Sequence, residues 1–295
     1  YAQVVRELLS TTGLTPADVL AVGAHGQTVR HQPPQPGNAC AYTLQLNQPA
    51  RLAELTGITV VADFRSRDIA AGGQGAPLVP AFHAGVFQAS GRDVAVLNLG
   101  GIANLTLLPA DGHIGGFDCG PANVLMDLWA QQNLGQAFDE QGRWAATGTV
   151  QTQLLQRWQE EAYFSKPAPK STGRDLFNMA WLQATDLSGH RPEDVQATLC
   201  ELSAWCVDDH LARELPSATQ LWVCGGGALN HALMQRLEQR LRARLGSEAR
   251  VASTQAAGLD PLDVEAAAFA WLAWRFLQGQ AGNVVRVTGA RGPRV

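Results

Sequence analysis

The sequence predicts an α/β protein built as two lobes. Its 295 residues exceed the length over which one hydrophobic core usually keeps growing, so two domains are favoured over one. Short runs rich in β-branched residues end in glycine turns, and some of these turns lead into segments with helical periodicity. Hydrophobic residues make up 46% and charged residues 16%, which is typical of a folded globular chain.

Residues 1–85 are expected to form what remains of the first lobe. The chain opens without a Met, and its first residues, YAQVVRELLS, already have the spacing of a helix face, so we expect an N-terminal part of this lobe to be missing. Short strands are predicted at residues 22–25 and 58–63. The stretch 70–83, AAGGQGAPLVPAFH, has too many glycines and prolines for a regular element, so it predicts an irregular loop leading to a short helix.

Residues 86–278 are expected to form the second lobe. It begins with a β-hairpin, whose two strands alternate around the glycine turn NLGGIAN. Helices follow at about residues 123–134, 150–163 and 192–214.

At the end of the second lobe, the sequence predicts a strand, a glycine loop and a helix. This order is carried by TQLWVCGGGALN, at residues 219–230, and by the periodic leucines that follow. A short strand, ARVAST, and an Ala-rich helix that begins after Asp-Pro complete the lobe. Residues 279–295 have little pattern, and we expect this tail to return to the first lobe.

Two glycine turns are candidates for binding phosphate. Such turns aim backbone N–H groups at phosphate oxygens, and the start of a helix adds partial positive charge. A tight structural connection is the alternative for each turn. Neither turn fits the P-loop or the dinucleotide-binding pattern, so these two classes are excluded. The candidate residues are Asn98, Gly100, Gly101 and Asn104 in the first turn and Gly225, Gly226, Gly227 and Asn230 in the second.

Asp118 is a candidate functional carboxylate. It lies in GFDCGPANVLMD, between glycines that let a ligand approach the backbone closely, where a strand gives way to a helix. An acidic helix cap would have the same pattern, so both interpretations stay open.

Further polar residues also have two interpretations each. His25 lies between glycines in GAHGQT and is either a structural turn residue or a sugar contact. Arg65 and Asp68 in ADFRSRDIA either pair at the surface or point into a cleft. Glu265 precedes small residues in a helix, and it is either a ligand contact or a solvated carboxylate.

Charge and cysteine content exclude several classes of partner. A net charge of −4 and the absence of a dense Lys/Arg block argue against nucleic acid and anionic membranes, and no apolar run reaches the roughly 20 residues of a membrane span. The histidines and cysteines lack the spacing of a transition-metal site. The five cysteines are scattered and odd in number, which favours a reducing cytoplasm.

Six segments in chain order resemble the family of 1,6-anhydro-N-acetylmuramic acid kinases. They are GAHGQTVRHQP, VVADFRSRDIAAGGQGAPLVPAFH, VLNLGGIANLT, GFDCGPANVLMD, PKSTGRDLFN and VCGGGALN, and they span nearly the whole chain. The resemblance implies the two-lobed, ribonuclease H-like fold of the actin, Hsp70 and hexokinase-like superfamily, with ATP in the cleft between the lobes. One departure is large: the first phosphate loop of the family, Gly-Thr-Ser-x-Asp-Gly, does not occur in this chain.

The resemblance also implies an activity and a site. The family opens the anhydro ring of its sugar and phosphorylates O6 with ATP, giving N-acetylmuramic acid 6-phosphate for peptidoglycan recycling. Asp118 matches the catalytic aspartate, the first glycine turn matches a phosphate loop, and the second lies near adenosine. Mg²⁺ would bridge the ATP phosphates without a protein cage. Sugar contacts are implied for Glu265 and, more weakly, for His25, Arg65, Asp68 and Gly120.

The sequence leaves alternatives for the function and for the assembly of the protein. A kinase of another sugar and a non-catalytic sensor of sugar or nucleotide are the alternative functions, because folds of this kind are shared by different activities. The expected partners are the anhydro amino sugar and ATP. The oligomeric state is undetermined, with a homodimer as one candidate assembly.

Overall fold

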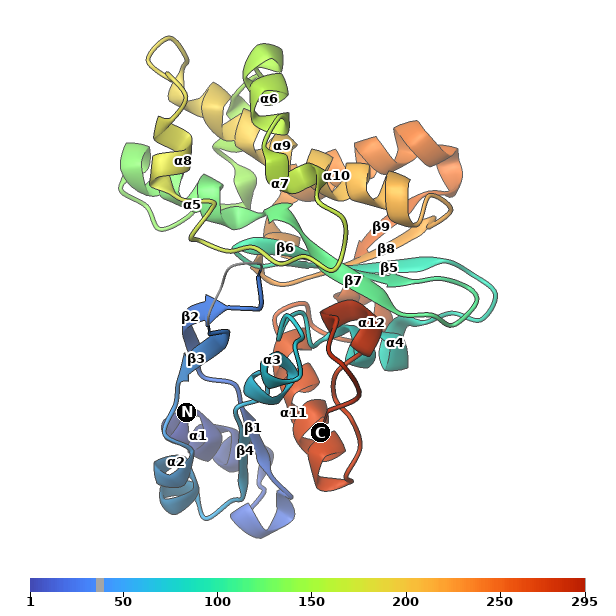
Figure 1. Ribbon diagram of the computed structural model, residues 1–295. Coiled ribbons are helices and arrows are strands. Elements are labelled where there is room, and N and C mark those ends of the chain that lie inside the picture. Colours follow the sequence, from blue (N-terminus) through green and yellow to red (C-terminus); the bar gives the residue numbers. More distant parts are fainter. Residues whose placement is uncertain (36–39, 295) are drawn as a thin grey trace. The chain divides into compact units, whose positions relative to one another are not determined.

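The computed structural model describes residues 1–35 and 40–294, and it confirms the predicted α/β class (Figure 1). The chain divides into two compact units, Tyr1–Phe82 with Glu265–Val295, and His83–Val264. Helix α11 (Val264–Leu277), which we expected in the second lobe, therefore groups with the first unit. The division into functional lobes itself stays a prediction.

The first unit contains two small sheets. Strand β1 (Val22–Ala24) pairs in parallel with β4 (Val60–Ala62), which confirms the two predicted strands. Helix α11 lies directly on β1, because a Cβ at Gly23 would collide with the carbonyl oxygen of Phe269. The remaining elements of this unit are β2 (Gln27–Gln32), β3 (Tyr42–Leu46), α1 (Ala2–Thr12), α2 (Pro49–Thr56), α3 (Ser66–Ala70) and α12 (Val285–Thr288).

The antiparallel hairpin of β2 and β3 was not predicted from the sequence. Its first strand, QTVRHQ, is largely polar and half-exposed, so it lacks the apolar alternation that identifies a strand buried on one face.

The second unit is built around a mixed five-stranded sheet in the order β7-β6-β5-β8-β9. The predicted hairpin is confirmed as β5 (Val94–Leu99) and β6 (Ile102–Leu108), and β7 (Gly115–Pro121) extends it antiparallel. Strands β8 (Gln220–Cys224) and β9 (Arg250–Ser253) run parallel to β5.

Helices α5 (Asn123–Leu134), α9 (Pro192–Glu214) and α10 (His231–Leu245) cover one face of this sheet (Figure 1). The predicted bounds of the first two are confirmed. The helix expected at residues 150–163 is instead two short helices, and it breaks where Glu161 accepts a hydrogen bond from Tyr163 as a new N-cap. The shorter helices of the unit are α6 (Thr152–Gln159), α7 (Ala162–Ser165) and α8 (Met179–Gln183), while α4 (Pro80–Phe87) ends in it.

The alternation of strand residues decides which side chains meet these helices. In β5, Ala95, Leu97 and Leu99 are fully buried in the core beneath α5, α9 and α10. Val94 and Val96 point the other way and pack around Phe87 of α4. Since side chains alternate along a strand, the next residue on this second face is polar, and it begins the candidate site.

Candidate active site

Three polar side chains stand in a row across β5, β6 and β7. The register pairs Asn98 with Asn104, and Asn104 with Asp118. Directly opposed residues of antiparallel strands project from the same face. The row therefore lies on the face opposite α5, α9 and α10, and it joins residues that lie up to 20 positions apart in the sequence.

Asp118 is held by hydrogen bonds to its carboxylate and its backbone. The Asn104 amide donates to Oδ1, and the Thr172 backbone N–H donates to Oδ2 at 2.9 Å. The Tyr163 hydroxyl donates to the Asp118 carbonyl oxygen at 2.8 Å. The side chain is only 5% exposed, so these donors stabilise a carboxylate that little water reaches. A carboxylate oriented in this way is suited to accept a proton.

The alternative interpretation of Asp118 as a helix cap is wrong. The N-cap of α5 is Ala122, and no side chain caps this helix. The start of α5 is satisfied instead by the first glycine turn: the Gly100 carbonyl accepts from the Asn123 backbone at 3.1 Å and from its side chain at 2.7 Å. The Gly101 carbonyl accepts from Val124 at 3.0 Å.

The glycines of the two turns differ in the space around them. A Cβ at Gly100 would have its nearest neighbour at 3.8 Å, and one at Gly226 would meet no atom within 4 Å. Gly225, in contrast, has a φ of 79° and lies against the Asn98 amide, and a Cβ at Gly227 would collide with Leu99. Gly225 and Gly227 are therefore required by packing, whereas Gly100 and Gly226 leave open space.

Asn230 has a structural role in addition to its predicted one. Its Oδ1 accepts from the Leu233 N–H at 3.1 Å and so caps α10. Gly120 is also fixed by packing, because a Cβ there would overlap the Phe164 ring and Cys206. These contacts explain both residues without a ligand, and their ligand-binding roles stay predictions.

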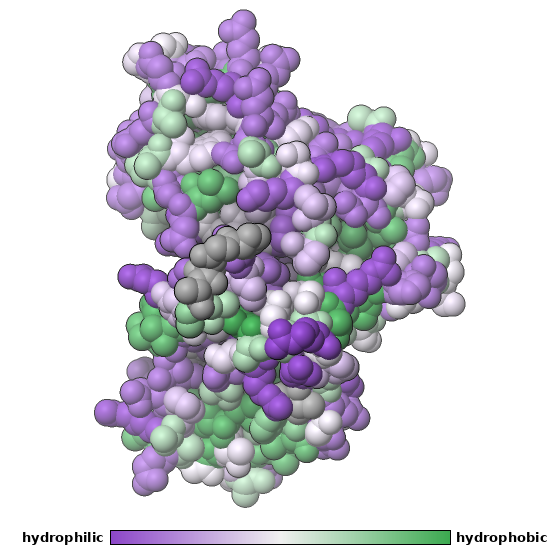
Figure 2. Space-filling view, viewed as in Figure 1, coloured by the Kyte–Doolittle hydropathy of each residue, from purple (hydrophilic) through white to green (hydrophobic). Residues whose placement is uncertain are grey.

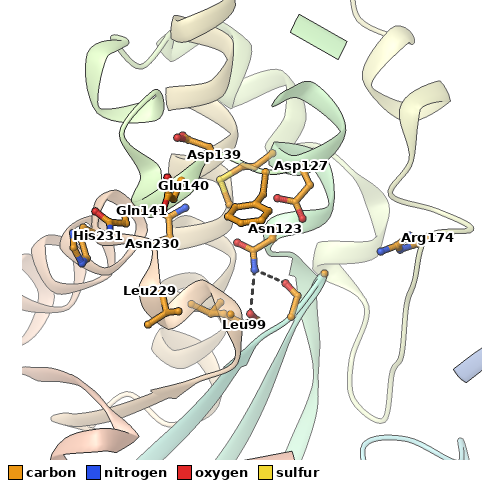
Figure 3. Close-up of a pocket in the computed structure, with 15 residues that line it drawn as sticks. Leu99, Asn123, Asp127, Asp139, Glu140, Gln141, Arg174, Leu229, Asn230 and His231 are labelled. Atoms are coloured by element: carbon orange, nitrogen blue, oxygen red, sulfur yellow. Dashed lines mark hydrogen bonds between the residues drawn. The ribbon is translucent and has the colours of Figure 1, made fainter. Parts of the chain in front are cut away.

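A cavity of about 560 Å³ lies within the second unit beside both glycine turns (Figure 3). Its volume falls in the range of small-molecule sites, roughly 300 to 1,000 Å³. Of the predicted nucleotide residues, Gly100, Gly101, Gly226 and Asn230 line this cavity. Asn98, Asn104, Gly225, Gly227 and Asp118 are not among its lining residues.

Asp127 lines the same cavity and was not identified as a site residue from the sequence. Figure 3 shows it one helical turn from Asn123, with Arg174 reaching in from a different segment. Burial raises the pKa of Asp127 to about 6, and Asp139 adds to this rise while Arg174 opposes it. A carboxylate with a raised pKa in a cavity is typical of functional sites. The i, i+4 spacing of Asn123 and Asp127 is the sequence signal that would have found it.

In the first unit, the structure brings His25 and Arg65 together. Arg65 donates from Nε to His25 Nε2 at 2.8 Å and from Nη1 to the Gly75 carbonyl at 2.7 Å. The His25 ring lies 4.5 Å from the Phe269 ring. Burial, and then the Arg65 charge, lower the pKa of His25 to about 4, so its Nε2 is an acceptor at neutral pH.

Asp68 is a buried structural acceptor. Its carboxylate accepts from the Gly75 N–H at 2.7 Å, the Thr288 hydroxyl at 2.7 Å and the Asn283 amide at 2.6 Å. These hydrogen bonds connect the glycine loop to the C-terminal segment of the same unit. Asp68 is therefore a buried structural residue and not part of a surface ion pair with arginine. Glu265 is exposed on the first turn of α11, and within residues 1–35 and 40–294 its side chain makes no hydrogen bond.

The part of the chain that the structure describes has neither a metal-ligand cluster nor a membrane-spanning helix. No three His, Cys, Asp or Glu side chains among them are grouped so as to hold a metal ion. Within 1–35 and 40–294, no helix combines the length and apolar character of a membrane span. Hydrophilic and hydrophobic residues are interspersed over the face drawn in Figure 2.

Comparison with known proteins gives one family over the whole chain. The family described as anhydro-N-acetylmuramic acid kinase matches residues 1–295. Proteins with that name include one from Variovorax paradoxus (strain S110), which is 56% identical over 302 residues, covering 100% of this chain and 79% of the relative. Another, from Burkholderia orbicola (strain AU 1054), is 54% identical over 298 residues, covering 100% and 76%.

Solved structures are more distant. An activator of 2-hydroxyisocaproyl-CoA dehydratase from Clostridium difficile is 13% identical with a TM-score of 0.44, over 81% of this chain and 86% of that one. Xylulose kinase from Rhodospirillum rubrum is 16% identical with a TM-score of 0.42, over 77% and 45%. At this similarity, neither structure informs the function of the chain.

Proposed function

Because this chain belongs to the family of anhydro-N-acetylmuramic acid kinases, we propose that it hydrolytically opens 1,6-anhydro-N-acetylmuramic acid and transfers the γ-phosphoryl group of ATP to O6. The products are N-acetylmuramic acid 6-phosphate and ADP. The observation that best supports this reaction is the Asp118 carboxylate, which is nearly buried and held by the Asn104 and Thr172 donors. The five described cysteines are free thiols, consistent with a reaction in the cytoplasm.

Asp118 acts as the general base in this proposal. It takes a proton from a water molecule while the water oxygen forms a bond to C1 of the sugar, and the C1–O6 bond breaks. C1 passes through an oxocarbenium-like transition state, as in glycoside hydrolysis. The Asn104 amide donates to one carboxylate oxygen and the Thr172 N–H to the other, so the two donors fix the orientation of the group that accepts the proton.

The departing O6 becomes the phosphoryl acceptor. An inverting glycosidase needs a second carboxyl group to protonate the leaving oxygen. Here the γ-phosphorus takes the place of that proton: O6 forms a bond to it, and the bond from phosphorus to the ADP oxygen breaks. One well-oriented carboxylate therefore suffices, which agrees with a site where Asp118 is the only carboxylate in the row across β5, β6 and β7.

The glycine turns are proposed to bind the nucleotide. Gly100 and Gly101 offer space for phosphate oxygens, and their carbonyls are already used by the start of α5. Gly226 leaves room beside the cavity for the nucleoside part of ATP. The Asn104 side-chain nitrogen donates a hydrogen bond to Asp118. Asn104 is therefore proposed both to orient the aspartate and to contact the phosphates.

Mg²⁺ fits this arrangement as an ion held mainly by phosphate oxygens and water, where it would offset the charge that develops on the transferred group. The described residues offer no protein cage, and Asp127 is the carboxylate that lines the cavity from α5. In the first unit, His25, Arg65 and Glu265 remain the proposed sugar contacts. Asp68 of the first unit and Gly120 of the second are weaker candidates, because packing already explains them.

The test is to incubate the protein with Mg-ATP and 1,6-anhydro-N-acetylmuramic acid and to analyse the sugar by mass spectrometry. The product must gain the elements of water as well as a phosphoryl group, and one ADP must form per sugar. A sugar that is phosphorylated with its anhydro bridge intact would contradict the proposed coupling. Phosphorylation of ordinary reducing amino sugars, without activity on the anhydro sugar, would favour a different kinase.

A further inference from the structure

The chain buries one of its two lysines next to the catalytic aspartate. Lysine is rare here, since only Lys166 and Lys170 occur among 22 basic residues. Lys166 is exposed, whereas Lys170 is 6% exposed. Burying an ammonium group costs free energy unless each of its donors finds a partner, so a lysine at this position needs a physical reason.

The Lys170 ammonium group has an acceptor for each of its three protons. Nζ donates to the carbonyl oxygens of Tyr163 at 3.2 Å and Phe164 at 3.3 Å, and to His210 Nε2 at 2.7 Å. His210 Nδ1 lies 2.6 Å from the Cys206 carbonyl oxygen, to which it can only donate, so Nε2 is the acceptor. The Tyr163 ring centroid lies 4.8 Å from Nζ and adds a cation–π contact.

These contacts join the two segments that hold Asp118. The Lys170 carbonyl oxygen accepts from the Asp118 N–H at 3.4 Å, and two residues later the Thr172 N–H donates to the carboxylate at 2.9 Å. The Tyr163 hydroxyl donates to the Asp118 carbonyl oxygen, and the Tyr163 carbonyl oxygen accepts from the Lys170 Nζ. The ammonium group thus connects the loop of residues 170–172 to α7, and both contact the same aspartate.

We propose that Lys170 is a positioning residue for Asp118: its buried ammonium group holds the 170–172 loop so that the Thr172 N–H stays bonded to the carboxylate. This inference rests on the proposed role of Asp118 as the general base. Fold stability alone does not explain a lysine here, because an apolar side chain of similar volume in such a place is often equally or more stabilising. The titratable and charged groups that act on the Lys170 ammonium group are His210, Cys119, Arg213, Cys206 and Glu214.

The first experiment compares Lys170→Met with the matched control Lys166→Met. Methionine keeps most of the volume and removes the charge and all three donors. Misplacing a reacting group by about 1 Å costs up to roughly 100-fold in rate, so we expect kcat to fall roughly 10- to 100-fold, with KM for ATP and sugar within about two-fold. Lys166→Met should keep the kcat of the unaltered protein. A folded Lys170→Met protein with unchanged kcat would overturn the proposal.

A second measurement does not depend on activity. The ¹³C signal of the Asp118 carboxyl group is followed against pH by NMR, and its midpoint should move to higher pH in Lys170→Met because a donor that stabilises the charged form is lost. Thr172→Pro, which deletes the N–H itself, should give the same shift, while Thr172→Ala keeps the N–H and the original midpoint. A midpoint that moves in Thr172→Pro but not in Lys170→Met, or in neither, would contradict the inference.

The two readouts separate this inference from the proposed function. If the unaltered protein does not act on the anhydro sugar, the proposed function fails, and the carboxyl titration alone then decides whether Lys170 positions Asp118. If Lys170→Met does not fold, Lys170→Leu, which also removes the charge and all three donors, replaces it in the same carboxyl titration, and an unmoved midpoint there overturns the inference.

Discussion

Replacing Asp118 by asparagine tests the proposed mechanism with little disturbance to the fold. The side chain lies between the Asn104 amide and the Thr172 N–H. The new amide at position 118 keeps its oxygen for the Thr172 N–H. Its NH₂ group can donate to the Asn104 carbonyl oxygen once that side-chain amide turns over, since the two ends of an amide have nearly the same shape. Both hydrogen bonds are therefore kept, while the proton acceptor is lost.

The expected loss of stability in Asp118→Asn is much smaller than the expected loss of catalytic rate. Exchanging charged for neutral hydrogen bonds at this nearly buried position should lower the free energy of unfolding by about 1 kcal/mol. Losing a general base costs roughly 10² to 10⁴ in rate, or about 3 to 5 kcal/mol in the activation barrier. Asp118→Ala, in contrast, leaves two donors without acceptors and should destabilise by about 1 to 3 kcal/mol for each.

The assay measures ADP release at saturating ATP and sugar, together with ATP binding by calorimetry and thermal unfolding. Asp118→Asn should keep the dissociation constant for ATP and most of its stability, and kcat should fall at least about 100-fold. Asp111→Asn is the matched control, because Asp111 is 62% exposed and pairs with His113. Normal turnover by Asp118→Asn would show that another group deprotonates the water, and the mechanism would have to be abandoned.

Three further predictions concern two residues that line the cavity and one buried histidine. Gly226→Leu should weaken ATP binding about 10-fold or more without destabilising the fold, because the side chain enters open space beside the cavity. Gly189→Leu, at an exposed glycine with equally open surroundings, is its control in calorimetry, and equal affinities would contradict the nucleotide assignment. Asp127→Asn should raise the free energy of unfolding at pH 7.5 by about 1 kcal/mol, because the raised pKa means that burial disfavours the charged carboxylate, although solvent screens part of this cost. The gain should vanish in urea unfolding below about pH 4, where the carboxyl group is protonated in both states. Burial lowers the pKa of His83 to about 3. Below about pH 6.5 the unfolded chain therefore binds a proton that the folded protein does not, so the free energy of unfolding decreases as the pH falls from 6.5 toward 3. Between pH 7 and pH 5, the free energy of unfolding should therefore decrease by about 2 kcal/mol less in His83→Phe than in the unaltered protein. Equal decreases in urea titrations at the two pH values would refute this.

The sequence determined the local elements and the identity of the family. The helices at Asn123–Leu134 and Pro192–Glu214 and the hairpin around Gly100 follow from periodicity and glycine placement, because these signals act over a few residues. The motif around Asp118 marked that carboxylate as a candidate, and six segments taken together indicated the family. Where local signals were weak, as in the polar hairpin of β2 and β3, prediction from the sequence failed.

Only the tertiary structure decided what each candidate residue touches. Strand register places Asn104 beside Asp118. Chain folding brings the Thr172 N–H to the carboxylate, and the Lys170 carbonyl oxygen to the Asp118 backbone N–H, from more than 50 residues away. The tertiary structure also showed that the Asp68 carboxylate accepts hydrogen bonds from residues of its own unit. Such contacts depend on which segments pack together, and that is set by the burial of apolar surface over the whole unit, which no short stretch of sequence contains.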